Sequence, residues 1–337
     1  MTAPYKNTVL TAKPAGQDPD AAGDPLLRRG SPLVMAGLGA ATISSSAVLV
    51  TLSGASPVAT AFYRAALALP LLAGLAWLEQ RRLGPRQAGR RLRAAGAGLF
   101  LAVDLILWAH AIADVGAGVA TVLGNLQVLF VAGIAWLLWK ERPGRAVALA
   151  LPVVITGVVL VSGLVGSPSG TGLHPLAGVW FGIGTSIAYA GYLLMLRRSS
   201  AASAHVAGPV ADATAGAAAG ALAYGLVFGG LGLQPVWPSI GWLAALALLS
   251  QTAGWLFIAS SLPRLPAAVS SLMLLLQPAA SLALAAVILG QQPTVAQIAG
   301  AILTCGGALL ASRSATKPAA EQAGAGAEPD PAPVVAG

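Results

Sequence analysis

Two charged side chains in this sequence, Arg64 and Asp104, lie inside long apolar stretches, where a charge needs a partner or a polar cavity. Arg64 follows the start of the stretch 57–78 by about seven residues, and Asp104 precedes the end of the stretch 95–113 by about ten. If both stretches are helices, these positions lie about 10 and 15 Å from the same end. They predict either a structural ion pair or a site for a solute carboxylate or a proton, while Arg64 alone could instead extend to the membrane interface.

Neutral polar and aromatic side chains in the apolar stretches are candidates for lining a cavity around these charges. Trp108 follows Asp104 by one helical turn and shares its face, so its ring could stack on a solute or pack between helices. The amides could orient a zwitterion or join helices by hydrogen bonds; they are Asn125, Gln127, Gln251 and Gln277. The hydroxyl and further aromatic candidates are Ser46, Tyr63, Tyr189 and Trp255.

The acidic residues Asp104 and Asp212 are the candidates for coupling solute movement to protons. Asp212 lies about one turn inside the stretch 206–229, where it could equally be a hydrated carboxylate at the cytoplasmic mouth. Three scattered His and one Cys offer neither a nucleophile with its base nor a cluster of metal ligands. We therefore expect no enzyme activity, no metal and no cofactor.

The elements that must position these residues are apolar stretches of about 20 residues, the length at which a helix spans a bilayer. Charged residues make up 9% of the chain, against about 25% in a soluble domain, and the mean hydropathy is +0.78. The composition predicts an all-α integral membrane protein, because segments that face lipid must satisfy their own backbone hydrogen bonds. Ten helices are expected, at 31–53, 57–78, 95–113, 117–139, 145–165, 174–196, 206–229, 239–260, 267–289 and 294–312.

The Lys and Arg residues other than Arg64 lie in the tails and in alternate gaps between these helices. Six are found between the second and third helices: Arg81, Arg82, Arg86, Arg90, Arg91 and Arg93. The positive-inside rule then places both termini in the cytoplasm, so the net charge of +8 reports topology rather than binding to nucleic acid. Residues 1–30 and 315–337 are polar and rich in Ala and Pro, and we expect them to be disordered cytoplasmic tails.

An internal duplication divides the apolar region into two halves. The run 117–127 is echoed by 267–277 at an offset of 150, and Pro143 and Gly157 match Pro293 and Gly307 at the same offset. Five helices per half form one repeat, at 31–165 and 174–312. Because five is odd, the second copy enters the membrane from the opposite face. Inverted repeats of this kind place a central binding cavity near the bilayer midplane, where alternating access can expose it to each side.

The repeated segments resemble the EamA repeats of the drug/metabolite transporter superfamily. The residues that carry the resemblance are SPVATAFYR at 56–64, GNLQ at 124–127, KERP at 140–143, LPRLPAA at 262–268, LQP at 276–278 and LGQQP at 289–293. The resemblance implies ten helices, with helices 1–4 and 6–9 around a central cavity and helices 5 and 10 at its periphery. One departure is Gln291, which stands where the first repeat has Glu141.

Taken with the resemblance, the sequence predicts a transporter in the cytoplasmic (inner) membrane of a bacterium. The expected activity is export of small amphipathic metabolites, such as amino acids or related compounds. Efflux of drugs or other cationic compounds by the same fold is the alternative, and a membrane-embedded enzyme or a scaffold is a weaker one. The expected partners are a small-molecule solute and the lipid bilayer, while the oligomeric state and the choice between proton coupling and facilitated diffusion stay open.

Overall fold

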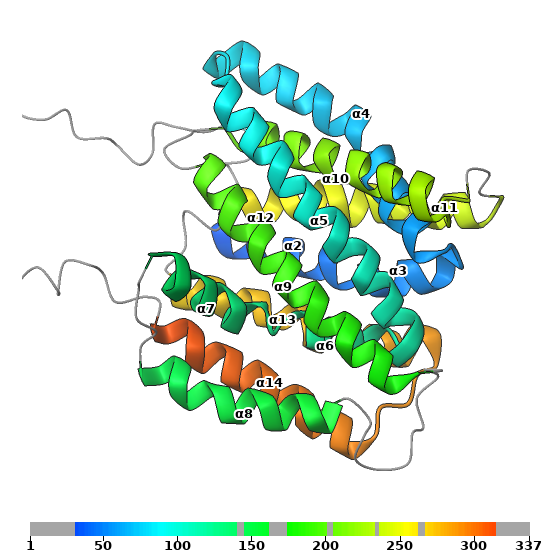
Figure 1. Ribbon diagram of the computed structural model, residues 1–337, viewed down its shortest axis with the longest axis vertical. Helices are drawn as coiled ribbons and strands as arrows, with labels where there is room; N and C mark the ends of the chain where they lie inside the picture. Colours follow the sequence, from blue (N-terminus) through cyan, green and yellow to red (C-terminus); the bar gives the residue numbers. More distant parts are fainter. Residues whose placement is uncertain are drawn as a thin grey trace, which may run out of the picture.

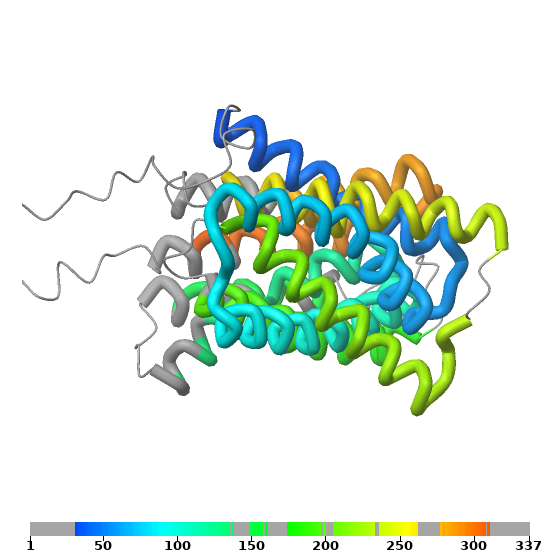
Figure 2. The backbone as a smooth tube through the Cα atoms, turned by 90° about the horizontal axis from the view of Figure 1, so that it is seen from above, coloured from blue at the N-terminus to red at the C-terminus, as the bar shows by residue number. Residues whose placement is uncertain are grey.

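The computed structural model describes residues 31–139, 145–161, 174–200, 205–232, 236–261 and 267–314, and within these ranges all regular structure is helical. The predicted tails 1–30 and 315–337, and Glu141, lie outside the described residues. The longest helices run between the same two ends of the molecule (Figures 1 and 2). The helices are α2 (Pro32–Ser44), α3 (Ser46–Ser53), α4 (Pro57–Leu83), α5 (Ala88–Val115), α6 (Ala117–Gly124), α7 (Gln127–Trp139), α8 (Arg145–Val161), α9 (Pro175–Ser200), α10 (Ala207–Phe228), α11 (Ser239–Ala245), η1 (Leu246–Gly254), α12 (Trp255–Ser261), α13 (Ala267–Leu289) and α14 (Val295–Ser314).

Six of the described helices or helix runs are long and apolar enough to cross a bilayer. They are Pro32–Ser53, Pro57–Leu83, Ala88–Val115, Pro175–Leu196, Ala207–Phe228 and Ser239–Ser261. Local sequence signals set their ends: α4 starts at Pro57, with the hydroxyl of Ser56 accepting from the amide of Ala59 at 3.2 Å. The same helix stops at Gly84, which has a φ of +85° that disfavours any residue with a Cβ.

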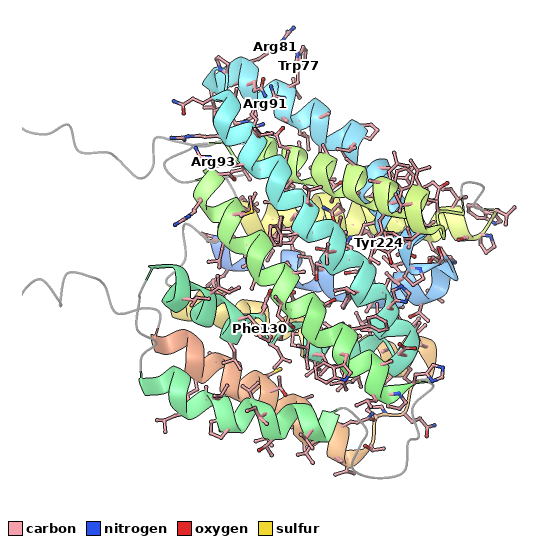
Figure 3. All side chains as sticks on the ribbon, in the orientation of Figure 1. Trp77, Arg81, Arg91, Arg93, Phe130 and Tyr224 are labelled. Atoms are coloured by element: carbon pink, nitrogen blue, oxygen red, sulfur yellow. The ribbon has the colours of Figure 1, made fainter. Side chains whose placement is uncertain are left out.

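The basic residues expected in a loop between the second and third helices lie mostly within the helices themselves. α4 continues to Leu83 and α5 begins at Ala88, so among the six only Arg86 lies in the short connection 84–87. The apolar stretch marks the part of a helix in hydrocarbon, and Arg and Leu are good helix formers that extend the helix beyond it. The guanidinium of Arg81 lies 3.7 Å from the ring centroid of Trp77, and Figure 3 shows Arg81, Arg91 and Arg93 at this end of α4 and α5.

Glycines allow α5 and α10 to approach until their backbones touch. A Cβ at Gly98 of α5 would meet the carbonyl oxygen of Ala213 and lie 2.7 Å from the amide nitrogen of Ala217. A Cβ at Gly216 of α10 would likewise meet the backbone of Ala95. Small residues at such crossings let membrane helices pack by close contact. At another edge of the molecule, α8 and α14 pack against each other in the same manner, with Gly157 against Thr304 (Figure 1).

Gly98→Ala should destabilise the protein by at least about 3 kcal/mol, because backbone atoms of α10 cannot move aside for the new methyl group as side chains can. Gly74→Ala on α4 is the matched control: it also replaces a helical glycine, but its Cβ would have no neighbour within 4 Å. That control should be neutral or stabilising by about 0.5–1 kcal/mol. Thermal unfolding of both purified variants measures the difference. Equal midpoints for the two variants would show that the crossing is looser than the structure indicates.

A buried carboxylate joins the end of α4 to the start of α10. The Oε1 atom of Glu79 accepts from the amides of Val206 at 2.6 Å and Ala207 at 3.1 Å, and its Oε2 atom accepts from the amide of Gly208 at 2.7 Å. These amides belong to the first turn of a helix, where they have no intrahelical partner and where the helix dipole favours a negative charge. Glu79 therefore caps a helix that begins 128 residues further along the chain.

Glu79→Ala should lower the free energy of unfolding by at least about 2 kcal/mol, because three amides lose a charged acceptor. Gln80→Ala tests the neighbouring position, whose side chain is only half-buried, and should change stability little. Thermal midpoints of the two variants in the same detergent provide the comparison. A loss of stability as large in Gln80→Ala as in Glu79→Ala would mean that the cap is not the cause.

Several spans are irregular within their length. α2 and α3 are separated at Ser45, and α6 and α7 at residues 125–126. The run from Ser239 to Ser261 contains the π-helical segment η1, and α13 contains Pro278. Interruptions of this kind expose backbone and polar side chains inside a membrane only where these line a cavity or are buried in protein. They indicate where a polar site would lie.

Candidate functional site

A cavity of about 100 Å³ lies among these irregular spans. Its lining comes from α2, α3, α4, α5, α6, α7, α9, α12 and α13, and none of its lining residues lies in the described parts of α8 or α14. The lining residues are Ile43, Ser46, Arg64, Leu101, Asp104, Leu105, Trp108, Thr121, Gly124, Asn125, Gln127, Thr185, Tyr189, Trp255 and Gln277. Nine of the eleven cavity candidates chosen from the sequence are therefore brought together: Ser46, Arg64, Asp104, Trp108, Asn125, Gln127, Tyr189, Trp255 and Gln277.

Arg64 is buried and is held by neutral acceptors on the π-helical segment. Its Nε donates to Oε1 of Gln251 at 2.9 Å, and its Nη2 donates to the hydroxyl of Ser250 at 3.0 Å. The guanidinium carbon lies 5.8 Å from the ring centroid of Trp108, within the range of a cation–π contact. These contacts fix the guanidinium in one orientation at the edge of the cavity.

Asp104 is also buried and lines the same cavity from α5. Its backbone oxygen accepts from the hydroxyl of Thr185 at 3.1 Å, which joins α5 to α9. Asp104 and Arg64 are close enough to attract each other electrostatically. Both side chains are fully described, yet no nitrogen of one lies within 4.0 Å of a carboxylate oxygen of the other. The direct ion pair that was one of the sequence-based alternatives is therefore not formed in this structure.

Aromatic rings form one wall of the cavity. Tyr189 and Trp255 line it, and Tyr192 lies behind them with its ring centroid 5.8 Å from that of Tyr189 and 5.4 Å from that of Trp255. Trp108 lies on the face of α5 that carries Asp104, as its spacing predicts. Rings of this kind offer an apolar surface to a side chain and a π-face to a cation.

One amide oxygen at the cavity is buried without a hydrogen bond. Oε1 of Gln127 accepts no bond from any residue in the described ranges, whereas the amide nitrogen of Asn125 donates to the backbone oxygen of Thr121 at 2.9 Å. A buried acceptor without a partner is uncommon and calls for an explanation. The hydroxyls of Thr121 and Ser281 lie 3.0 Å apart and join α6 to α13 beside this point.

Three predicted site residues lie away from the lining. Tyr63 packs edge-on against Phe62, with ring centroids 5.1 Å apart, and does not line the cavity. Gln251 contacts Arg64 rather than the cavity itself. Asp212 lies at the end where α4 connects to α5, with its Oδ2 atom 2.7 Å from Nη2 of Arg86 and 3.8 Å from Nε of Arg91. Asp212 is thus engaged in ion pairs and is not a freely hydrated carboxylate.

Sequence reasoning missed the residues that support the site from behind. Ser250, Thr214 and Tyr192 are buried polar or aromatic residues in apolar helices, and nothing in their local sequence distinguishes them from packing residues. Ser250 had one usable signal, since it directly precedes Gln251 in an otherwise apolar helix.

The site combines a fixed cation, a carboxylate, an unpaired amide oxygen and an aromatic wall. Two buried charges of opposite sign that do not touch each other are complementary to a solute that carries both a carboxylate and an ammonium. In the described part of the chain, the lining contains no Ser, Cys or Thr next to a His base and no group of three metal-ligating side chains. The arrangement offers a small molecule charged, polar and aromatic contacts.

The chain is similar to known proteins in its sequence family and in its fold. A model of the EamA-like transporter family matches residues 31–163 and 176–313. A solved structure titled "Crystal structure of protein" is similar with a TM-score of 0.58 and 20% identity, over 84% of this chain and 99% of that chain. At this identity the similarity concerns the fold alone. No curated protein matches the sequence.

Proposed function

Because the chain belongs to the EamA-like transporter family, we propose that this multi-pass membrane protein transports small amphipathic zwitterions, with amino acids and related compounds as the leading class. The observation that carries the proposal is that Arg64 and Asp104 line one cavity without contacting each other. A solute carboxylate would bind the guanidinium of Arg64, and its ammonium would bind Asp104 and the free Oε1 of Gln127. The side chain of the solute would lie against Tyr189 and Trp255.

The size of the cavity supports transport by alternating access. Sites that enclose small molecules usually measure about 300–1,000 Å³, whereas this cavity measures about 100 Å³. The helices around it must therefore separate before a solute enters. In our proposal they do so alternately toward each side of the membrane, which is the motion that repeated helical units around a midplane site permit.

We further propose ten spans in two inverted repeats, with both termini in the cytoplasm of a bacterial inner membrane and with export as the direction. The four spans added to the six long helices would be α6 with α7, α8, α13 and α14. The basic end of α4 and α5 supports this orientation. Asp104 is the candidate for proton coupling, because Asp212 already pairs with Arg86 and Arg91.

Reporter fusions test this topology. A reporter that is active only outside the cytoplasm should be active when fused after Ser167 and inactive when fused after Arg198, because one span lies between the two positions. A reporter active only in the cytoplasm should give the opposite pattern at both sites. The same side for both fusions would contradict the inverted arrangement.

Efflux of cationic compounds by the same fold is the competing function. Asp104 and the aromatic wall favour it, since a carboxylate and π-faces are sufficient to bind an organic cation. The buried Arg64 opposes it, because a fixed guanidinium repels a cation in a cavity of low dielectric. Removing Arg64 should therefore weaken the binding of a zwitterion but strengthen the binding of an organic cation.

Flux into proteoliposomes tests the proposal. The probes are matched triplets for alanine, leucine and phenylalanine: each amino acid, the carboxylic acid without the amine, and the amine without the carboxylate. The proposal expects saturable flux of at least one amino acid and little flux of its acid or amine. An enzyme or a scaffold would move none of them, and a cation exporter would move the amines.

A further inference from the structure

We infer that Ser250 and Gln251 are positioning residues that hold the guanidinium of Arg64 away from Asp104, so that both charges stay available to the solute. The inference rests on the proposed function, because it explains how a site can keep two opposite charges apart when no solute is bound. It concerns residues behind the cavity rather than residues that line it.

The hold on Arg64 is directional. The guanidinium donates through Nε to Gln251 and through Nη2 to Ser250, and these two bonds fix both the position of the group and the plane in which it lies. Trp108 limits it further, with its ring centroid 5.8 Å from the guanidinium carbon. A guanidinium in this position reaches the cavity but makes no ion-pair contact with Asp104.

The two acceptors are themselves fixed from other helices. Nε2 of Gln251 donates to the hydroxyl of Thr214 on α10 at 3.0 Å, and the hydroxyl of Ser250 donates to that of Ser46 on α3 at 3.1 Å. Ser46, Thr214, Ser250 and Gln251 are all at most 2% exposed. A buried hydrogen-bond network in which each member is satisfied is rigid, because any displacement leaves a polar group without a partner.

The π-helical geometry of η1 explains how two consecutive residues reach the same guanidinium. In a π-helix the hydrogen bonds run from residue i to residue i+5, so each turn holds more residues and successive side chains diverge less around the axis than in an α-helix. The hydroxyl of Thr252 donates to the backbone oxygen of Ala247, five residues earlier, at 2.9 Å. This local widening brings Ser250 and Gln251 to Arg64 together, and such segments are frequent at functional sites.

Without this hold, the two charges would attract each other strongly. Opposite charges in a region of low dielectric interact far more strongly than in water, and the flexible Arg side chain could swing toward α5. A direct Arg64–Asp104 pair would then compete with the solute, because it would occupy the two side chains that bind the charged groups of the solute. The apparent affinity for the solute is proportional to the fraction of protein molecules in which the two charges remain apart.

Thermal unfolding of the empty full-length protein tests the inference without any solute. Asp104→Asn is introduced into the wild type and into the variant Ser250→Ala/Gln251→Leu. In the wild type it should leave the midpoint unchanged or raise it, because it removes a buried carboxylate that has no direct partner. In the Ser250→Ala/Gln251→Leu background it should lower the midpoint, because there it removes one member of a newly formed pair. The same shift in both backgrounds would overturn the inference.

Equilibrium binding with the leucine triplet supplies the second readout. Ser250→Ala/Gln251→Leu should weaken leucine binding about tenfold or more, and in this background Asp104→Asn should tighten binding of 4-methylpentanoate, which carries only the carboxylate, by a larger factor than it does in the wild-type background. Ser261→Ala is the matched control, since it removes a buried hydroxyl that bonds within its own helix, α12, outside the π-helical segment, and it should bind leucine as the wild type does. An equal gain in 4-methylpentanoate binding in the two backgrounds would show that Ser250 and Gln251 do not separate the charges.

Failure of the proposed function gives a different result. If Arg64→Leu binds each amino acid of the triplets as the wild type does, or if the wild type binds none of them, Arg64 is not a solute ligand. The thermal comparison then still decides whether Ser250 and Gln251 keep Arg64 apart from Asp104.

Discussion

Replacing Arg64 with Leu should lower binding and transport of an amino acid by between about 30-fold and about 4,000-fold. The range follows from the 2–5 kcal/mol or so that is lost when one partner of a buried, hydrogen-bonded charge pair is removed, at about 1.4 kcal/mol per tenfold change. Arg64→Lys should recover part of the loss, because it keeps the charge but cannot donate to Gln251, Ser250 and a carboxylate in the same fork geometry. Binding and flux are measured together on purified protein.

Arg81→Leu is the matched control for that experiment. It removes a basic residue from the same helix, but one that lies on Trp77 at the end of α4 and away from the cavity. Its binding should equal that of the wild type. Monodispersity and the thermal midpoint show whether each variant is folded. An Arg64→Leu variant that is folded and moves amino acids normally would remove Arg64 from the site, and one that moves organic amines faster would favour cation efflux.

Asp104→Asn should reverse the preference of the protein between an amino acid and its matched carboxylic acid. The amino acid loses its ammonium partner and should bind about 30-fold more weakly or worse. The carboxylic acid keeps Arg64 and no longer meets a like charge, so it should bind more tightly than to the wild type. Competition between the two compounds, measured on one preparation, gives the ratio directly.

The double variant Arg64→Leu/Asp104→Leu separates this account from a structural ion pair. A pair that only locks α4 to α5 would be replaceable by two apolar residues, and transport would return in the double variant. Because Arg64 and Asp104 do not contact each other in the structure, we expect the double variant to stay inactive even where it folds. Recovery of flux would show that the charges serve only the packing of the helices.

The helices could be predicted from the sequence because the thickness of the bilayer sets the length of the apolar stretch that a spanning helix needs. The predicted stretch 267–289 agrees with α13, and 206–229 agrees with α10 within one residue at each end. The predicted ends of α4 and α5 were wrong for a physical reason. A membrane helix continues beyond the hydrocarbon, and charged residues there do not terminate it. Glu79 lies in the segment that was expected to be a loop, and no local pattern shows that it caps a helix 128 residues away.

Most of the cavity lining could also be predicted, because polar residues are costly in lipid and must turn inward. The residues that support the site from behind could not be predicted. Their contacts depend on how each helix is rotated about its axis, and the sequence does not show that rotation. Gln251 illustrates the point, because the π-helical segment changes the helical register on which any prediction of facing residues rests. Thr214 is likewise indistinguishable from the small packing residues of α10 until its bond to Gln251 is known.

Equilibrium binding of the three matched triplets to the purified wild-type protein tests the central claim most directly, because it requires no assumption about direction or energy coupling. At least one amino acid should bind about tenfold or more tightly than both its acid and its amine, since each of these leaves one buried charge without a partner. An amine that binds as tightly as its amino acid would contradict the claim that Arg64 and Asp104 together select a zwitterion.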